Sequence, residues 1–173
     1  PGIHRGSTLD RLETGVKPFP GFPEISITVD LGFTWNVSEA LPGPDEADFF
    51  SVLLHEVTHG LGFASVIESD GSSALGSDNY TTYDSLLFDA ALNRLLLTDS
   101  IPPFFQGDST SLTGGALEFD GPESFTRYDT GDRVPVFSPN PIQPGSSLSH
   151  WDLGRLVGGA VMTHSITLGT TQR

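Results

Sequence analysis

The alternation of apolar and polar positions near the start of the chain predicts a β-strand. Residues 1–24 are rich in Gly and Pro, and we expect them to form loop with at most one short helical turn. The next segment, EISITVDLGFTW at 24–35, places Ile25, Ile27 and Val29 on one face. A period of two is the spacing of side chains along one face of a strand. We therefore expect a strand over residues 24–35.

A helical repeat follows a turn-rich connector and predicts one well-defined helix over residues 47–62. The repeat runs through Phe49, Val52, Leu53, Glu56 and Gly60. Asp45 or Asp48 precedes the repeat and can accept hydrogen bonds from its first free N–H groups. Gly60 and Gly62 mark the end of the helix, because glycine is the residue most often found there.

The middle of the chain consists of short apolar runs between turns. The run YDSLLFDAALNRLLL at 83–97 fits either one helix or two short strands around AALN. Short strands are expected in GGALEFDG at 114–121 and in RVPVFS at 133–138, because turn residues bound each run. The segment 138–147 is Pro-rich and predicts an extended loop.

The composition narrows the partners and sites that are possible. With 22 acidic and 8 basic residues, the net charge of −14 repels phosphate, so we expect no nucleic-acid partner. The absence of cysteine excludes thiolate metal sites and disulfides. No apolar run approaches the roughly 18–20 residues of a membrane span. The chain opens without Met, which we interpret as a trimmed end that leaves targeting signals undetermined.

The helix carries a short motif with metal chemistry, His55-Glu56-x-x-His59. Residues four apart lie on the same face of a helix, so both imidazoles can reach one ion. Neutral imidazole binds zinc without cancelling its charge, which leaves the ion able to acidify a bound water. Glu56 is placed to take a proton from that water. The alternative is a plain helix with one buried and one surface histidine.

The motif continues to a glycine and there resembles a known group of enzymes. HEVTHGLG resembles the HExxHxxG start of the metzincin clan of zinc metallopeptidases, with Gly62 at the position of the family glycine. This resemblance implies that the helix stops at Gly62 and that the chain turns sharply beneath the metal. Ser65 stands where the compact family motif has its third histidine, and serine is a poor zinc ligand.

The downstream sequence is similar to that of leishmanolysin-like metzincins, which insert a long segment before the third histidine. His150 lies 91 residues after His59, and Met162, the sole methionine, follows 12 residues later. The resemblance therefore implies that His150 is the third zinc ligand and that Met162 forms the family's methionine turn. Less specifically, the segments 83–89 and 138–152 and the expected methionine turn are also similar to predicted secreted bacterial zincins.

Other residues remain candidates for the third ligand. His164 follows Met162 by two residues, and Asp152 could bind metal directly or accept a hydrogen bond from a ligand. A thermolysin-like arrangement would use a glutamate on a second helix, and Glu118 and Glu123 are the nearest options. His4 has no supporting context.

The resemblance implies an α+β zincin-like fold, in which the active-site helix lies under a small twisted sheet. It implies one catalytic domain: an N-terminal lobe at 1–64, a β- and loop-rich insert at 65–149, and a third-ligand and methionine-turn segment at 150–173. The implied activity is zinc-dependent hydrolysis of peptide bonds in a protein or peptide substrate. In this reaction a metal-bound water attacks the peptide carbonyl, and Glu56 is the general base. The location that the resemblance implies is secreted or at the cell surface of a bacterium.

The oxyanion-stabilising group, a second cofactor and the function itself each have more than one candidate. The oxyanion-stabilising group is unassigned, with Tyr80, Tyr83 and Tyr128 as candidates. Calcium is a further candidate cofactor at the acidic stretches 45–48 and 69–79, although neither has the spacing of an EF-hand loop. The competing functions are a zinc-binding module without catalysis and a β-rich adhesion or carbohydrate-binding module.

Overall fold

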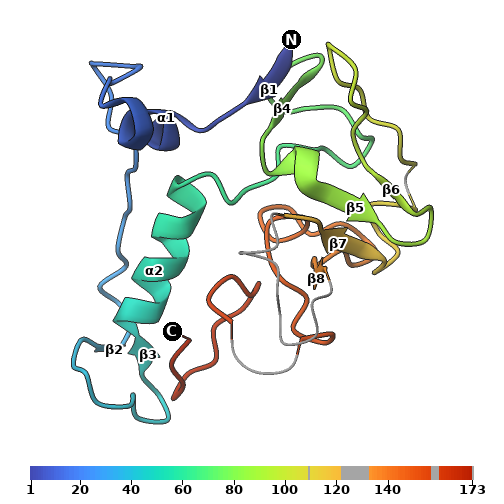
Figure 1. Cartoon of the computed structure of the whole chain (residues 1–173). Helices are drawn as coiled ribbons and strands as arrows, with labels where there is room; N and C mark the ends of the chain where they lie inside the picture. Colours follow the sequence, from blue (N-terminus) through green and yellow to red (C-terminus); the bar gives the residue numbers. More distant parts are fainter. Residues whose placement is uncertain (109, 122–132, 157–159, 173) are drawn as a thin grey trace.

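The computed structural model describes residues 1–108, 110–121, 133–156 and 160–172. It is a small mixed α/β fold with two helices and small sheets among these residues (Figure 1). The helices are α1 (Ser7–Thr14) and α2 (Phe49–Gly60), with one 3-10 turn, η1 (Asp84–Leu86). The strands are β1 (Gly2–His4), β2 (Trp35–Asn36), β3 (Ala47–Asp48), β4 (Asn79–Thr81), β5 (Leu87–Asp89), β6 (Arg94–Leu95), β7 (Leu117–Phe119) and β8 (Val134–Pro135). Neither helix is long and apolar enough to cross a membrane.

Helix α2 confirms the helix predicted for residues 47–62, and Asp48 rather than Asp45 caps it. The Asp48 carboxylate accepts hydrogen bonds from the backbone N–H of Ser51 at 3.1 Å and from its hydroxyl at 2.5 Å. The same Ser51 hydroxyl accepts a hydrogen bond from the backbone N–H of Gln172, 2.7 Å away. The first turn of α2 is therefore held by its own cap and by the C-terminal segment, which lies beside it in Figure 1.

The strand predicted for residues 24–35 is wrong over most of its length. Only Trp35 and Asn36 pair, as β2, in a parallel register with Ala47 and Asp48 of β3. Residues 25–30 run alongside α2 without joining a sheet (Figure 1). The alternating pattern predicts an extended backbone, whereas a strand also requires a neighbour to accept and donate hydrogen bonds.

The N-terminal segment, expected to be loop, holds more structure than its composition suggests. Helix α1 spans eight residues and ends at Gly15, whose φ of +71° suits glycine. Strand β1 pairs in parallel with β4, far along the chain. The N-terminal residues are thus tied to the insert by backbone hydrogen bonds.

The main sheet lies in the insert and contains four strands in the order β6-β5-β7-β8, all antiparallel. The run at 83–97 forms a 3-10 turn and two short strands, which confirms the second of its two predicted alternatives. The strands expected in 114–121 and 133–138 are confirmed as β7 and β8.

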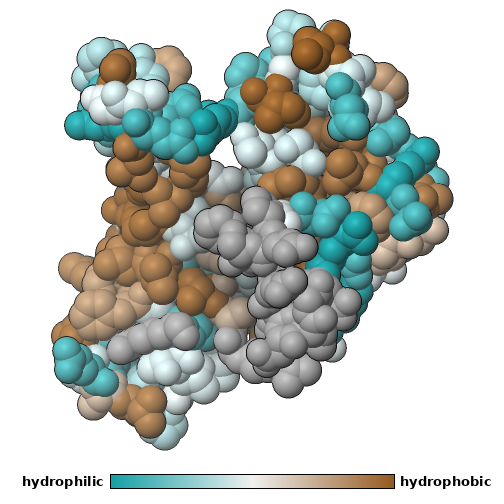
Figure 2. Space-filling view, viewed as in Figure 1, coloured by the Kyte–Doolittle hydropathy of each residue, from teal (hydrophilic) through white to brown (hydrophobic). Residues whose placement is uncertain are grey.

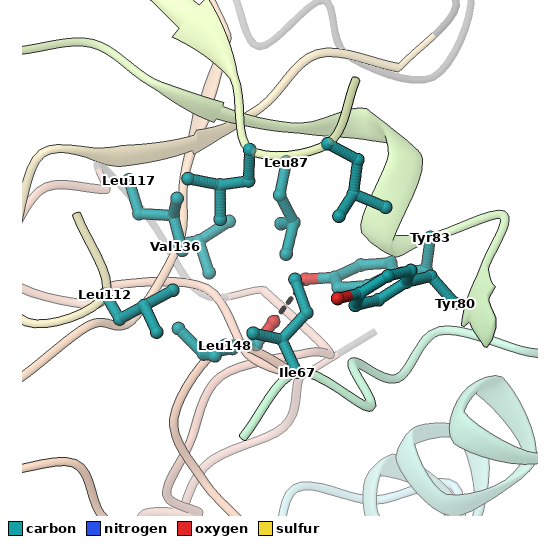
Figure 3. Packing of buried hydrophobic residues seen from close by; sticks show 10 residues of the cluster. Ile67, Tyr80, Tyr83, Leu87, Leu112, Leu117, Val136 and Leu148 are labelled. Carbon is teal, nitrogen blue, oxygen red and sulfur yellow. Dashed lines mark hydrogen bonds between the residues drawn. The ribbon is translucent and has the colours of Figure 1, made fainter. Parts of the chain in front are cut away.

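The hydrophobic core sits under this sheet, where Leu87, Leu117 and Val136 are fully buried (Figure 3). Figure 3 also shows the Tyr83 hydroxyl donating to the backbone carbonyl of Leu148, a bond of 2.8 Å. The core therefore reaches the loop that leads to His150. The small twisted sheet expected over α2 is not confirmed, because among the described residues the strands adjoining α2 are β2 and β3.

Candidate metal centre

Three histidine side chains meet at one point although they lie far apart in the sequence. His55 and His59 project from α2, and His150 comes from the turn-rich segment before the C-terminus. Their Nε2 atoms are 3.1 Å apart for His55 and His59, 3.2 Å for His59 and His150, and 3.1 Å for His55 and His150. These three histidines lie close enough together to bind a metal ion.

The other nitrogen of each ring contacts a backbone carbonyl. Nδ1 of His55 lies 2.7 Å from the carbonyl oxygen of Val161. Nδ1 of His59 lies 2.6 Å from that of Phe63, and Nδ1 of His150 lies 2.7 Å from that of Ser146. A carbonyl oxygen can only accept, so each Nδ1 carries the proton and donates it. The hydrogen on Nδ1 fixes the tautomer and aims the Nε2 lone pair at the shared centre.

This arrangement of lone pairs suits a cation. With the proton on each Nδ1, three Nε2 lone pairs face one another at 3.1–3.2 Å. A buried acceptor without a donor costs about 1–3 kcal/mol. A tetrahedral metal with bonds of about 2.0–2.1 Å to imidazole would separate its nitrogen ligands by about 3.3–3.4 Å. The observed separations differ from that value by a few tenths of an ångström, so the histidines fit such an ion.

The environment favours the neutral, metal-binding form of His150. Its side chain is buried, and burial lowers its pKa to about 4 because it disfavours the imidazolium. The hydrogen bond to Ser146 opposes this shift, while the neighbouring imidazoles of His59 and His55 add to it. The imidazole of His150 is therefore neutral at neutral pH, with its Nδ1 protonated and the lone pair of Nε2 free to bind a cation.

Backbone hydrogen bonds hold the segment that carries His150. The N–H of Phe137 donates to the carbonyl of His150 at 2.8 Å, and the N–H of Leu148 donates to the carbonyl of Phe137 at 2.9 Å. On the other side, the N–H of Trp151 donates to the carbonyl of Met162 at 2.6 Å. His150 is thus flanked by two chain segments, one from the insert and one from the C-terminus.

An aromatic cluster joins the two parts of the chain that supply the histidines. Phe63 follows α2, and its ring packs edge-on against Trp151 with centroids 4.6 Å apart. Tyr83 and Phe119 complete the cluster, at 4.7 Å and 6.0 Å from Phe63. Because Trp151 is the neighbour of His150 and Phe63 supplies the carbonyl that orients His59, this packing sets the distance between α2 and the third histidine.

Asp84 anchors the chain just after the helix. Its buried carboxylate accepts hydrogen bonds from the backbone N–H groups of Val66 and Thr81 and from the Thr81 hydroxyl. Burial raises the pKa of Asp84 despite these bonds, which lower it. The hydroxyl of Ser149 also accepts a hydrogen bond from the N–H of Ser65, so this loop is held to the segment preceding His150.

Gly62 makes the turn that brings the Phe63 carbonyl to His59. The N–H of Gly62 donates to the carbonyl of His59 at 2.9 Å, and the N–H of Phe63 donates to that of Thr58 at 3.2 Å. This pair of bonds is the Schellman ending of a helix, which needs a residue with positive φ after the last turn. Gly62 has φ +106°. The glycine of the motif therefore acts through the backbone on one of the three converging histidines.

Replacing Gly62 by Ala should lower the free energy of unfolding and weaken metal binding. A residue with Cβ held at φ +106° costs of the order of 1–3 kcal/mol. Relief of this strain would move the Phe63 carbonyl away from His59, and loss of such an orienting contact lowers metal affinity about 10–100-fold. Titration against a metal chelator measures the affinity.

Gly76 provides the matched control for this substitution. It also has positive φ, +91°, and an added Cβ there would meet open space. Gly76→Ala should therefore lose stability yet bind metal as the parent does. Unchanged metal affinity in Gly62→Ala would contradict the role of the turn.

Glu56 and Met162 lie beside the histidine group in different ways. Glu56 is exposed, next to His55 and one turn before His59 on α2. Met162 is buried within a turn, where its carbonyl is bound to Trp151 and its neighbour Val161 orients His55. The single methionine is therefore buried between Val161, which contacts His55, and the backbone of Trp151, which follows His150.

Four other candidate ligands lie in the described part of the chain, and the structure places them outside the group. His164 stacks on Phe137 with ring centroids 3.7 Å apart, and its Nδ1 is buried without a hydrogen-bond partner. The Asp152 carboxylate accepts a hydrogen bond from the N–H of Gly154. Glu118 forms an ion pair with Arg155 at 3.1 Å, and His4 contacts Asn79. Glu123 lies outside the described residues.

The two tyrosine candidates that the structure describes belong to the core and not to the histidine group. Tyr83 is bound to Leu148, and the hydroxyl of Tyr80 donates to the carbonyl of Gly71 at 3.0 Å, so both belong to the core. Burial raises the pKa of both phenols. Tyr128 lies outside the described residues.

The acidic stretches proposed for calcium do not form a site in the part of the chain that the structure describes. His55, His59 and His150 are there the one group of three or more potential ligands whose atoms converge. Asp48 is instead engaged as the cap of α2.

Sequence reasoning missed the groups that orient the histidines. They are the backbone carbonyls of Phe63, Ser146 and Val161. A carbonyl leaves no trace in the identity of its residue, so the neighbouring Gly62 is the signal that could have indicated one of them.

Comparison with known proteins does not place this chain in a family. No protein-family model, no curated protein and no solved structure matches it.

Proposed function

We propose that this chain is a zinc-dependent endopeptidase. The observation that carries the proposal is the convergence of three Nε2 atoms from His55, His59 and His150, each oriented by a carbonyl on its Nδ1. Three imidazole ligands suit zinc, and catalytic zinc sites have three protein ligands with a fourth position open. Within the described residues no further His, Asp or Glu side chain joins this group, so that position is available to water and substrate.

Zinc bound there would supply a Lewis acid that polarises the scissile carbonyl and acidifies a water. Glu56 would take the proton of the attacking water and pass it to the leaving amine. Its place on α2 supports this role, because Glu56 lies three residues before His59, a spacing that puts the two side chains on the same side of the helix. The three histidines stay neutral, so they leave the charge of the ion undiminished.

The wider assignment that we propose with this activity is a zincin-like fold of the metzincin type. Gly62 at the helix end and Met162 in a buried turn beside Val161 support it. A protein or peptide is the proposed substrate, and a secreted or cell-surface location goes with this class of enzyme. The proposed cofactor is one zinc ion per chain.

The test combines metal content with hydrolysis by the same sample. The metal-free chain is titrated with Zn²⁺, and cleavage of a mixed-sequence quenched-fluorescent peptide pool is measured after each addition. We expect saturation at about one ion per chain, hydrolysis that rises with occupancy, and loss of hydrolysis on adding a chelator. Stoichiometric zinc binding without hydrolysis would instead support a zinc-binding module. Absence of zinc binding would refute both functions.

A further inference from the structure

A five-residue stretch of extended chain has an unpaired backbone on both edges. Its ends are held, because the carbonyl of Glu24 accepts from the Thr8 hydroxyl and that of Asp30 accepts from the Trp35 indole. Between them, the described structure gives the backbone of residues 25–29 no hydrogen bond. Free strand edges are sites of pairing with another chain.

The side chains of this stretch are already arranged as in a sheet strand. Ile25 packs over Gly60, where an added Cβ would come within 2.6 Å of its Cδ1. Ile27 and Val29 border a groove of about 200 Å³ against the first half of α2. Ser26 and Thr28 alternate with them in sequence and are exposed, and Thr28 and Asp30 also line the edge of the groove. One face of the stretch therefore lies on α2, and its two edges remain available.

The surface around the stretch is unusually apolar. Eleven of the eighteen exposed large apolar side chains lie between residues 16 and 54. Leu31 is 84% exposed, Phe22 71% and Phe33 57%. Figure 2 shows hydrophobic colour continuing along the side of the molecule that carries α2.

The size of this surface is that of a protein interface. At the areas typical of such side chains, the exposed apolar surface is on the order of 1,000 Å². A stable interface buries about 800 Å² per partner, so the summed exposed area of these side chains is of that order.

We propose that a second copy of this chain covers the surface, by antiparallel pairing of residues 25–31 with the same residues of the copy about a two-fold axis at Thr28. In this register Ile27 lies opposite Val29 of the copy, and Ile25 lies opposite its Leu31. Opposite residues of antiparallel strands share a face, so the apolar side chains of both strands point toward the two α2 helices. A two-fold axis makes the interface self-complementary, as closed dimers require.

The positions of the charged side chains are compatible with this register. Glu24 lies opposite Gly32 of the copy, so no carboxylates of the two strands face each other directly. Glu24 is also neutralised within its own chain by Arg11, at 2.7 Å, and by Lys17, at 3.8 Å. The net charge of −14 on each copy opposes association at long range, so the dimer is expected to tighten as salt is raised.

The mass in solution is the first test. Light scattering on the eluted peak should give twice 18.5 kDa for the parent at about 50–100 µM protein. Leu31→Lys should elute as a monomer, with its association weakened at least about 10-fold. Ile101→Lys is the matched control, because Ile101 is 95% exposed and lies outside the surface, and it should remain dimeric. Far-UV circular dichroism of each variant reports that the fold is intact.

Cross-linking tests the register. The chain has no native cysteine, so any disulfide must form through the introduced residue. Thr28→Cys places two thiols opposite each other at the axis and should form a disulfide dimer under mild oxidation. Ser26→Cys is its control, because the two thiols would lie about 13 Å apart along the strands and should not join. A monomeric parent, or equal cross-linking of the two variants, would overturn the proposal. Neither result depends on peptidase activity, so this proposal and the proposed function fail separately.

Discussion

Glu56→Gln is expected to lower kcat for peptide hydrolysis by about 10²–10⁴-fold, the contribution typical of a general base. The amide is close in size to the carboxylate but cannot take a proton from water. Zinc content should stay at the parent level, because Glu56 is exposed beside the histidine group and is not one of its members. Steady-state kinetics on a single cleaved peptide, with metal analysis of the same sample, measure both quantities.

The exposed Glu39 provides the control for this charge change. Glu39→Gln removes the same charge from a loop away from the histidines and should leave kcat and zinc content unchanged. If Glu56→Gln kept the activity of the parent, Glu56 would not be the base. If it lost zinc, the effect on activity would have a different origin.

His150→Ala is expected to weaken zinc binding by more than the 10–100-fold that loss of an orienting contact produces, because it removes a ligand. Two imidazoles four residues apart on one helix remain, and they hold the ion in an incomplete site. Binding of a ligand to the folded state alone raises the melting temperature. The parent should therefore melt higher with zinc than without it, whereas His150→Ala should show little difference.

Two further variants keep this test specific. His164→Ala removes an imidazole outside the group and should bind zinc as the parent does. His150→Gln retains most of the buried volume, so a loss of affinity shared with His150→Ala would not reflect a cavity. Zinc binding retained by both His150 variants would show that another residue completes the site.

The parts of the fold that were predictable are those whose cause is local. Helix α2 follows from its apolar repeat, the cap Asp48 and the terminal Gly62, all of which act within one or two turns. The convergence of His55 and His59 follows from the same helix. The placement of His150 was predicted through the resemblance, since nothing local links residues 91 apart.

The parts that were not predictable depend on distant partners or on the backbone. The alternation at 24–35 predicts an extended chain, but whether it becomes a strand depends on a neighbour. The apolar residues of the run at 83–97 fit both a helical and a strand period. In the structure the run contains two strands, with Asn93 at φ +52° in the turn between them. Helix α1 lies in a Gly- and Pro-rich stretch, and this composition predicted loop rather than helix.

The three carbonyls that orient the histidines have a consequence for how this centre can change over generations. Side-chain replacement at Phe63, Ser146 or Val161 leaves the oxygen in place wherever the path of the chain is kept. An alanine scan at Ser146 and Val161 would therefore not detect the carbonyls that orient the histidines. Substitutions that redirect the backbone, as at Gly62, would reveal them. The centre could thus persist through wide drift of the surrounding sequence, with few residue identities to mark its ancestry.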